Sequence, residues 1–152
     1  LASSKGEITL TSTDPNEQPF LDFHLLEEQE DLSRIRESVR IAVKLFSHKD
    51  FDPLVERIID PLGSDLKSDE NLDKWIHREV TTGQHLTGTC KMGPPSDPMA
   101  VVNERLDVYQ LKGLSIADAS VMPNTVRANT NATTIMIGER MAHFIRNESS
   151  FT

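Results

Sequence analysis

The 152-residue sequence has a single cysteine, no long apolar run and fewer basic than acidic residues. With one cysteine, Cys90, it has neither an internal disulfide nor a zinc site built from cysteines. No apolar stretch approaches the roughly 20 residues that a membrane-spanning helix requires. The 16 Lys+Arg against 24 Asp+Glu give a net charge of −8, and an acidic chain lacks the basic surface that binds nucleic acid or anionic membranes. We therefore expect no nucleic-acid partner and no membrane span.

The composition is that of a globular protein, with 37% hydrophobic and 26% charged residues. The charge is uneven: residues 1–80 contain 18 acids and 10 bases, whereas residues 81–152 contain 6 of each. The simplest interpretation is a solvated helical half beside a more buried half. The first residue is Leu1 rather than Met, and no targeting peptide follows it. This favours a processed or truncated chain.

Residues 1–80 predict an extended segment followed by helices. Alternating polar and apolar residues over 7–12 predict a strand, a turn follows at 13–16, and residues 20–23 predict a second extended piece. Period-3.6 patterning predicts a helix over 28–48, whose inward face would carry Leu32, Ile35, Val39, Ala42, Val43 and Phe46. A short helix is expected over 52–59, and a further helix over 69–80 with Ser68 as its N-cap.

Residues 81–152 predict a different organisation. Three glycines and three prolines make residues 83–98 a loop, and residues 114–117 form a candidate buried strand. A Ser/Thr/Asn-rich entry precedes a helix over 132–147, and such an entry can leave backbone N–H groups free to hold an anion. The expected core face of this helix consists of Ile135, Met136, Met141, Ala142 and Ile145.

One histidine lies in a loop suited to ligand contact. His85 opens the segment His85-Leu86-Thr87-Gly88-Thr89-Cys90-Lys91-Met92-Gly93. Glycines let a backbone approach a ligand closely, and histidine titrates near neutral pH, although a lone loop histidine is more often an ordinary surface residue. His85 and Cys90 would lack further metal ligands, so no metal is expected. A Cys–His nucleophilic pair is disfavoured because Cys90 has only Lys91 as a charged neighbour.

Several spaced motifs resemble one known family. In order along the chain they are His85-x-x-Gly88-Thr89-Cys90-x-Met92-Gly93, Ala100-Val101-Val102, Gly113-Leu114, Asp118-Ala119-Ser120-x-Met122-Pro123 and Asn129-Thr130-Asn131-x-x-Thr134-x-Met136-Ile137. Together they resemble the C-terminal region of the glucose–methanol–choline (GMC) oxidoreductases, which are FAD-dependent. The dense match covers residues 85–145, and the earlier segment resembles the end of the family's substrate domain more loosely.

The resemblance implies a set of site residues. His85 and Asn129 would be the catalytic pair facing the flavin, and Asp118, Ala119, Asn129, Thr130 and Asn131 would bind the cofactor, Thr130 and Asn131 through their backbone. Gln84, Leu86, Thr82 and Val126 are candidates for the pocket wall. Leu86 stands where most members of the family have proline.

The resemblance also implies a fold and a reaction. The expected fold is α+β in this chain, forming the C-terminal part of a two-domain α/β FAD enzyme. Residues 1–80 would belong to the substrate-binding domain and residues 81–152 to the FAD-binding domain. The expected reaction oxidises an alcohol to an aldehyde, ketone or lactone. The alternatives are a non-catalytic remnant of the family, or a lyase or decarboxylase on the same FAD scaffold.

The family's Gly-x-Gly-x-x-Gly nucleotide-binding turn is absent from the sequence. The expected partners are therefore a small-molecule alcohol and an N-terminal FAD-binding portion, from the same gene or a companion chain. Without that portion we expect the chain to be inactive. We also expect it to be poorly soluble, because its docking faces would be exposed.

Overall fold

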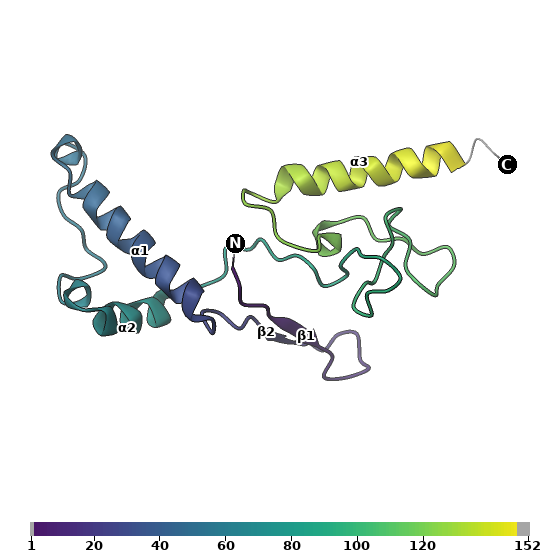
Figure 1. Cartoon of the computed structure of the whole chain (residues 1–152), viewed down its shortest axis with the longest axis horizontal. Coiled ribbons are helices and arrows are strands. Elements are labelled where there is room, and N and C mark those ends of the chain that lie inside the picture. The colour runs from purple at the N-terminus through teal and green to yellow at the C-terminus, as the bar shows by residue number, and fades with distance from the viewer. Residues whose placement is uncertain (1, 149–152) are drawn as a thin grey trace. The chain divides into compact units, whose positions relative to one another are not determined.

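The structure is a computed structural model that describes residues 2–148 (Figure 1). Its elements, with η denoting a 3-10 helix, are β1 (Glu7–Thr9), β2 (Phe20–Asp22), α1 (Gln29–Phe46), η1 (Lys49–Phe51), η2 (Asp65–Lys67), α2 (Asp69–Glu79), η3 (Ala119–Val121) and α3 (Asn131–Glu148). The chain forms two compact units, divided between Thr82 and Gly83. Helices together with a small sheet confirm the α+β expectation.

The unit of residues 2–82 begins with an antiparallel hairpin. Ile8 of β1 pairs with Leu21 of β2, so both predicted extended pieces form strands. The first strand is shorter than the predicted 7–12, since the ladder ends at Thr9 and Leu10 is 81% exposed. Gly6 is needed where the hairpin begins, because a Cβ there would lie 2.2 Å from the carbonyl oxygen of Asp22.

Helices α1 and α2 form the rest of this unit, as the periodicity predicts. Their core consists of Leu26, Leu32, Leu72 and Ile76, with Val39, Leu66, Trp75 and Val80 packed against it. The Ser68 hydroxyl accepts a hydrogen bond from the backbone N–H of Asn71, which confirms the predicted N-cap. Two side chains of the predicted inward face of α1, Ile35 and Phe46, are instead 39% and 47% exposed.

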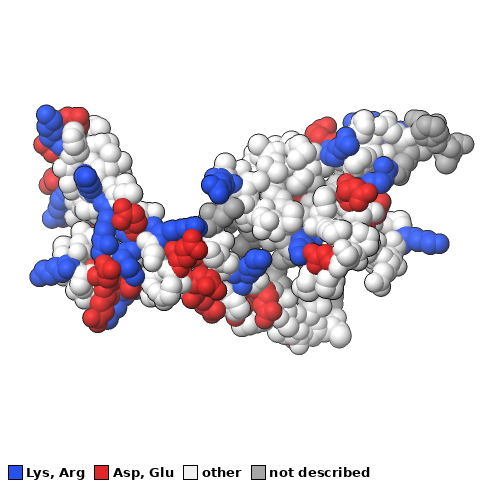
Figure 2. Space-filling model, viewed as in Figure 1, with Lys and Arg blue, Asp and Glu red and all other residues white. Residues whose placement is uncertain are grey.

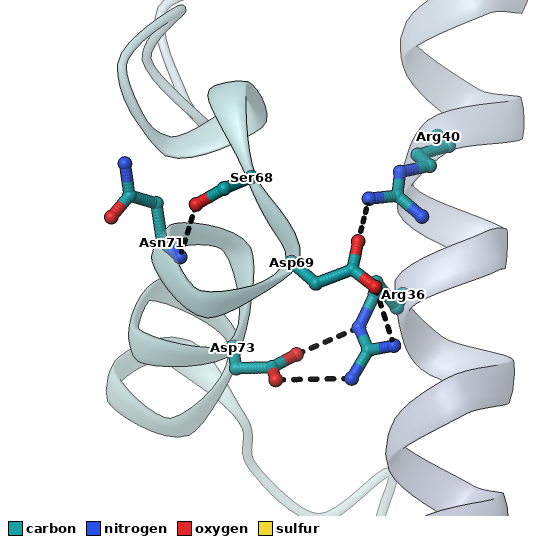
Figure 3. A network of polar contacts seen from close by, with 6 residues as sticks. All are labelled: Arg36, Arg40, Ser68, Asp69, Asn71 and Asp73. Carbon is teal, nitrogen blue, oxygen red and sulfur yellow. Dashed lines mark hydrogen bonds and ion pairs between the residues drawn. The ribbon is translucent and has the colours of Figure 1, made fainter.

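A polar network joins α1 to α2, with side chains of the two helices pointing toward one another (Figure 3). Arg36 binds Asp73 through two hydrogen bonds, Nε to Oδ1 at 2.8 Å and Nη2 to Oδ2 at 3.0 Å. Asp69 accepts from Arg40 and from Nη1 of Arg36. The hydrogen bond from Arg40, together with the charges of both arginines, lowers the pKa of Asp69. The bidentate pair of Arg36 and Asp73 orients the two helices as well as neutralising charge.

The prediction of a helix over 52–59 is wrong. Among the described residues, the helical ones adjacent to this segment are the three of η1. The ring of Phe51 in η1 packs edge-on against the ring of Phe46. The His48 ring accepts from the backbone N–H of Asp50 and caps this short turn. Pro53 lies beyond η1 rather than at a helix start, and residues 55–59 contain no regular element. The segment has too few covered apolar residues to stabilise a longer helix, since Leu54 is 81% and Ile59 73% exposed.

The unit of residues 83–148 is built largely from loops packed under one helix. Its core is Val102, Leu106, Val121, Met122 and Ile137. The predicted strand at 114–117 is wrong. Only an isolated bridge, Asp107 with Ser115, forms there, although the N–H of Ile116 reaches the carbonyl of Leu106 at 3.0 Å.

Helix α3 confirms the predicted helix over 132–147, but its buried side differs from the expected one. Ile137 is buried, whereas Ile135, Met136 and Ile145 are each more than half exposed. Met141 packs against the core as expected. Consecutive apolar residues on this helix point in several directions, and the unit covers only the direction of Ile137 and Met141.

The two units differ in surface charge. On the face drawn in Figure 2, acidic and basic side chains crowd over the α1–α2 unit, while most of the other unit is neither. This agrees with the uneven charge of the sequence. Over residues 2–148, no helix combines the length and the apolar character needed to cross a membrane.

Candidate functional site

Backbone hydrogen bonds bring the loop after His85 beside the segment of the Asp118 motif. The N–H of Cys90 donates to the carbonyl of Ser120 at 3.0 Å, and the N–H of Met92 donates to the carbonyl of Val121 at 2.8 Å. These bonds lie within one unit and bury Val121 and Met122 beneath the loop. Two motifs separated in sequence are therefore one structure in space.

The motif glycines have local reasons for being glycine. Gly88 has a φ of 87°, a left-handed conformation that is costly for any residue with a Cβ. A Cβ on Gly93 would lie 2.9 Å from the Cβ of Ala100. Gln84, directly before the histidine, also has a positive φ of 60°, and such strained residues cluster at functional sites. The loop that carries His85 is thus held in a specific and partly strained shape.

The two predicted catalytic side chains are in direct contact. Nε2 of His85 lies 3.2 Å from Nδ2 of Asn129, although 44 positions separate them in sequence. Nδ1 of the same ring lies 3.0 Å from the hydroxyl oxygen of Thr130. His85 and Asn129 are exposed, while Thr130 is buried. Both nitrogens of the ring are therefore in contact with the residues that lead into α3.

The entry into α3 fixes Asn129 and Thr130. Oδ1 of Asn129 accepts from the backbone N–H of Asn131 at 3.0 Å. The carbonyl of Thr130 accepts from the N–H of Thr134 and from the Thr134 hydroxyl, both at 2.9 Å. One of the N–H groups expected to hold an anion, that of Asn131, is therefore already used by a side chain. What it holds in place is the amide that faces His85.

The remaining predicted cofactor residues lie at η3. Oδ1 of Asp118 caps this turn by accepting from the N–H of Ser120 at 2.7 Å, and the Asp118 residue is exposed. Ala119 packs against the core of the unit. Of the candidates for the pocket wall, Leu86 is 56% exposed, whereas Val126 packs against the same core as Ala119.

The hydroxyl of Thr130 is the site feature that sequence reasoning missed. Only its backbone was expected to take part, through cofactor contact. Its position immediately before a helix is that of an N-cap residue, whose hydroxyl usually accepts from a backbone N–H of the first turn. The sequence therefore contained a signal for the hydroxyl, but that signal pointed to the helix and not to His85.

No group of three or more His, Cys, Asp or Glu side chains within residues 2–148 is arranged to hold a metal ion. Cys90 is a free, half-buried cysteine. The polar groups that surround His85 are instead an amide and a hydroxyl. An amide can donate or accept a hydrogen bond and a hydroxyl can do both, so either ring nitrogen of His85 has a hydrogen-bonding partner.

The fold belongs to a class of oxidoreductases. The family model described as GMC oxidoreductase matches residues 2–138. The chain belongs to the GMC oxidoreductase family, and its fold is that of the family's C-terminal region. The resemblance drawn from the motifs is thereby confirmed.

Curated relatives are similar over nearly all of this chain. The oxygen-dependent choline dehydrogenase of Cronobacter sakazakii is 40% identical over 143 residues, which are 94% of this chain and 25% of the relative. The enzyme of the same name from Rhizobium etli is 38% identical over 95% of this chain and 26% of its own length. The chain thus spans about a quarter of the curated relatives that it matches.

The fold is similar to that of solved flavoenzymes. Formate oxidase of Aspergillus oryzae, in a structure that concerns modification of its FAD, aligns with a TM-score of 0.86 and 30% identity. The alignment covers 97% of this chain and 26% of that one. An FAD-dependent oxidoreductase from Chaetomium thermophilum aligns with a TM-score of 0.83 and 26% identity over 95% of this chain and 25% of that one, which supports the expectation of FAD as the cofactor.

Proposed function

We propose that this chain is the C-terminal part of an FAD-dependent enzyme that oxidises a CH–OH donor to an aldehyde, ketone or lactone. The observation that carries the proposal is the contact between His85 Nε2 and Asn129 Nδ2 at 3.2 Å, with both residues exposed. One group accepts a proton and the other donates a hydrogen bond, and an alcohol needs both at its hydroxyl.

The roles of the two side chains follow from their chemistry. Oxidation of an alcohol removes the hydroxyl proton and a hydride from the carbon, and bound FAD supplies the hydride acceptor. A neutral His85 would take the hydroxyl proton at Nε2, an effect worth about 10²–10⁴ in rate. Asn129 does not titrate, so its amide would donate to the substrate oxygen and orient it. A hydroxyl that binds between the two groups would replace their mutual hydrogen bond.

The residues present suit the flavin end of the cofactor. Asp118 and the N-terminus of α3 belong to the same unit as His85 and are exposed. The N-terminus of an α-helix carries roughly half a positive charge, which would favour negative charge on a bound ring. We propose Asp118, Ala119, Asn129, Thr130 and Asn131 as the residues that line it.

The division of the chain into two units supports the proposal that its two halves belong to different domains of the enzyme. Residues 1–80 would be the C-terminal piece of the substrate-binding domain, and residues 81–152 would be that of the FAD-binding domain. The nucleotide half of the FAD site would come from an N-terminal portion that carries the glycine-rich turn, encoded in the same gene or in a companion chain. In this proposal the 152 residues alone are inactive.

The test uses the flavin-loaded protein that contains both this chain and the N-terminal portion, and compares it with its variant His85→Ala. The names of the relatives make choline the first substrate to try, followed by other primary and secondary alcohols under anaerobic conditions. Bleaching of the flavin absorbance should follow mixing with the right alcohol. We expect His85→Ala to slow it by about 10²-fold or more. The control is His77→Ala, which alters an exposed histidine on α2.

Near-normal bleaching in His85→Ala would remove His85 from its role. Flavin that stays oxidised with every alcohol would contradict the proposal. A remnant would then show no turnover, whereas a lyase or decarboxylase would turn over its substrate without net alcohol oxidation.

A further inference from the structure

We propose that the hydroxyl of Thr130 is a positioning group that, together with the Asn129 amide, holds the proton of neutral His85 on Nδ1 and thereby leaves Nε2 as the base. The proposal rests on the proposed function for its catalytic consequence, but the position of the proton follows from contacts within the chain. It concerns a side chain to which the family resemblance assigns no role.

The backbone of Asn131 fixes the orientation of the Asn129 amide. Its Oδ1 accepts from the backbone N–H of Asn131 at 3.0 Å. A backbone N–H only donates, so the atom that faces Asn131 must be the oxygen. The amide nitrogen is therefore the atom that lies 3.2 Å from Nε2 of His85.

The orientation of the Asn129 amide in turn determines which nitrogen of neutral His85 carries the proton. An amide NH₂ also only donates, so Nε2 must accept and carries no proton in this arrangement. A neutral imidazole has one proton, which then lies on Nδ1. Nδ1 lies 3.0 Å from the hydroxyl oxygen of Thr130, and that oxygen accepts from it.

The surroundings of Thr130 suit its hydroxyl to this role. The residue is only 9% exposed, so little water competes for its hydroxyl. Its carbonyl is bound by the N–H and the hydroxyl of Thr134, which hold its backbone at the start of α3. The hydroxyl lies beside the His85 ring. In an ordinary N-cap it would instead accept a hydrogen bond from a backbone N–H of the helix. Thr130 thus presents an acceptor to Nδ1 of His85, and Asn129 presents a donor to Nε2.

The experiment compares Thr130→Val with Thr130→Ser in the flavin-loaded protein. Valine keeps the shape of threonine and removes the hydroxyl, whereas serine keeps the hydroxyl. Long-range proton–nitrogen correlation spectra of protein labelled with ¹⁵N-histidine show which ring nitrogen carries the proton. The signal absent from His85→Gln identifies His85. Thr133→Val, at a half-buried threonine in the first turn of α3, is the matched control.

We expect the proton on Nδ1 in the parent protein, in Thr130→Ser and in Thr133→Val. In Thr130→Val the Asn129 amide still donates to Nε2 but the N–H at Nδ1 has lost its acceptor, so a measurable share of the proton should move to Nε2. For an alcohol that reduces the flavin, kcat of Thr130→Val should fall about tenfold, the size of one hydrogen bond. KM should change little, because the Thr130 hydroxyl contacts Nδ1 and not the nitrogen proposed to take the substrate proton. Thr130→Ser should recover most of kcat.

A proton on Nε2 in the parent protein would overturn the proposal, as would a proton that stays wholly on Nδ1 in Thr130→Val. Equal losses of kcat in the valine and serine variants would show that Thr130 only shapes the loop. The spectra do not depend on turnover. If no alcohol reduces the flavin while the proton moves as expected, the proposed function fails and the assignment of Thr130 stands.

Discussion

Asn129 and His85, separated by 44 positions in the sequence, meet through Nδ2 and Nε2 at 3.2 Å. The same amide uses its oxygen to bind the first backbone N–H of α3. Asn129 therefore links the start of a helix to the ring of the proposed base. Its side chain has two faces with opposite hydrogen-bonding roles, so substitutions that change one face at a time are informative.

We expect Asn129→Asp to lower alcohol turnover more than Asn129→Ala does. Alanine removes a donor, which at catalytic sites costs about 10²–10³ in kcat. Aspartate presents an acceptor to Nε2 and would draw the ring proton to that atom, so it removes the donor and disables the base together. Steady-state kinetics of the flavin-loaded variants measure the difference. Asn124→Ala, at an exposed loop asparagine, is the control, and turnover by Asn129→Asp at the level of Asn129→Ala would contradict this argument.

Gly88→Ala should destabilise the protein and impair the site. The φ of 87° at Gly88 is a left-handed conformation, which costs a residue with a Cβ about 1–2 kcal/mol. Relaxation of that strain would move the loop that carries His85. Gly83→Ala is the matched control, because Gly83 has no positive φ and its Cβ would meet nothing within 4 Å. Thermal unfolding should show a lower melting temperature for Gly88→Ala and no loss for Gly83→Ala.

The bidentate pair of Arg36 with Asp73 should stabilise the packing of α1 on α2. The Arg36 side chain is 17% exposed and that of Asp73 26%, whereas Arg34 and Glu30 are 52% and 62% exposed. Exposed ion pairs contribute little because water screens them. Arg36→Gln should therefore lower the melting temperature by a few degrees (on the order of what one lost interaction causes), and Arg34→Gln by less. Equal melting temperatures would show that the pair in Figure 3 contributes no more than an exposed one.

Asp31 should make stability depend on acid pH. Hydrogen bonds from the N–H groups of Ser4 and Ser3 and from the Ser4 hydroxyl hold the pKa of its carboxyl below the ordinary value of 3.8. A lowered folded-state pKa gives stability that is complete above the unfolded value and is lost as the pH falls through the folded one.

The test is Asp31→Asn, followed by melting temperatures measured from neutral to strongly acidic pH. The variant should be less stable than the parent above about pH 5, and the gap should close as the pH falls below 3.8. Glu37→Gln, at an exposed residue of α1, should leave the curve unchanged. A gap that stays constant into acid would mean that the Asp31 carboxylate contributes nothing through its charge.

The helices could be predicted from the sequence because periodicity and caps are local. Residues 69–80 carry Ser68 in front and Leu72 and Ile76 at helical spacing, and α2 forms there. The two main errors have tertiary causes. Residues 114–117 resemble a strand in sequence but pair with a neighbouring segment through only one bridge. Residues 52–59 have too few covered apolar residues, since Leu54 and Ile59 are exposed.

The candidate site could be located from motif order but not assembled. His85 and Asn129 were identified by resemblance, whereas their contact depends on the path of the chain through η3 and into α3. The role proposed for Thr130 could not be found in the same way. A threonine before a helix has the same sequence signature whether its hydroxyl caps the helix or holds a histidine.

The sequence alone indicated the family and the three α-helices α1, α2 and α3, because both depend on residue type and on spacing along the chain. Only the tertiary structure decided which apolar side of α3 is covered and which atoms surround His85. Ile135, Met136 and Ile137 are adjacent and all apolar, and burial of Ile137 alone follows from its packing on Val121 and the rest of the core. In the same way, the proton of His85 is placed by the neighbours of both ring nitrogens, which the fold brings from a distant segment.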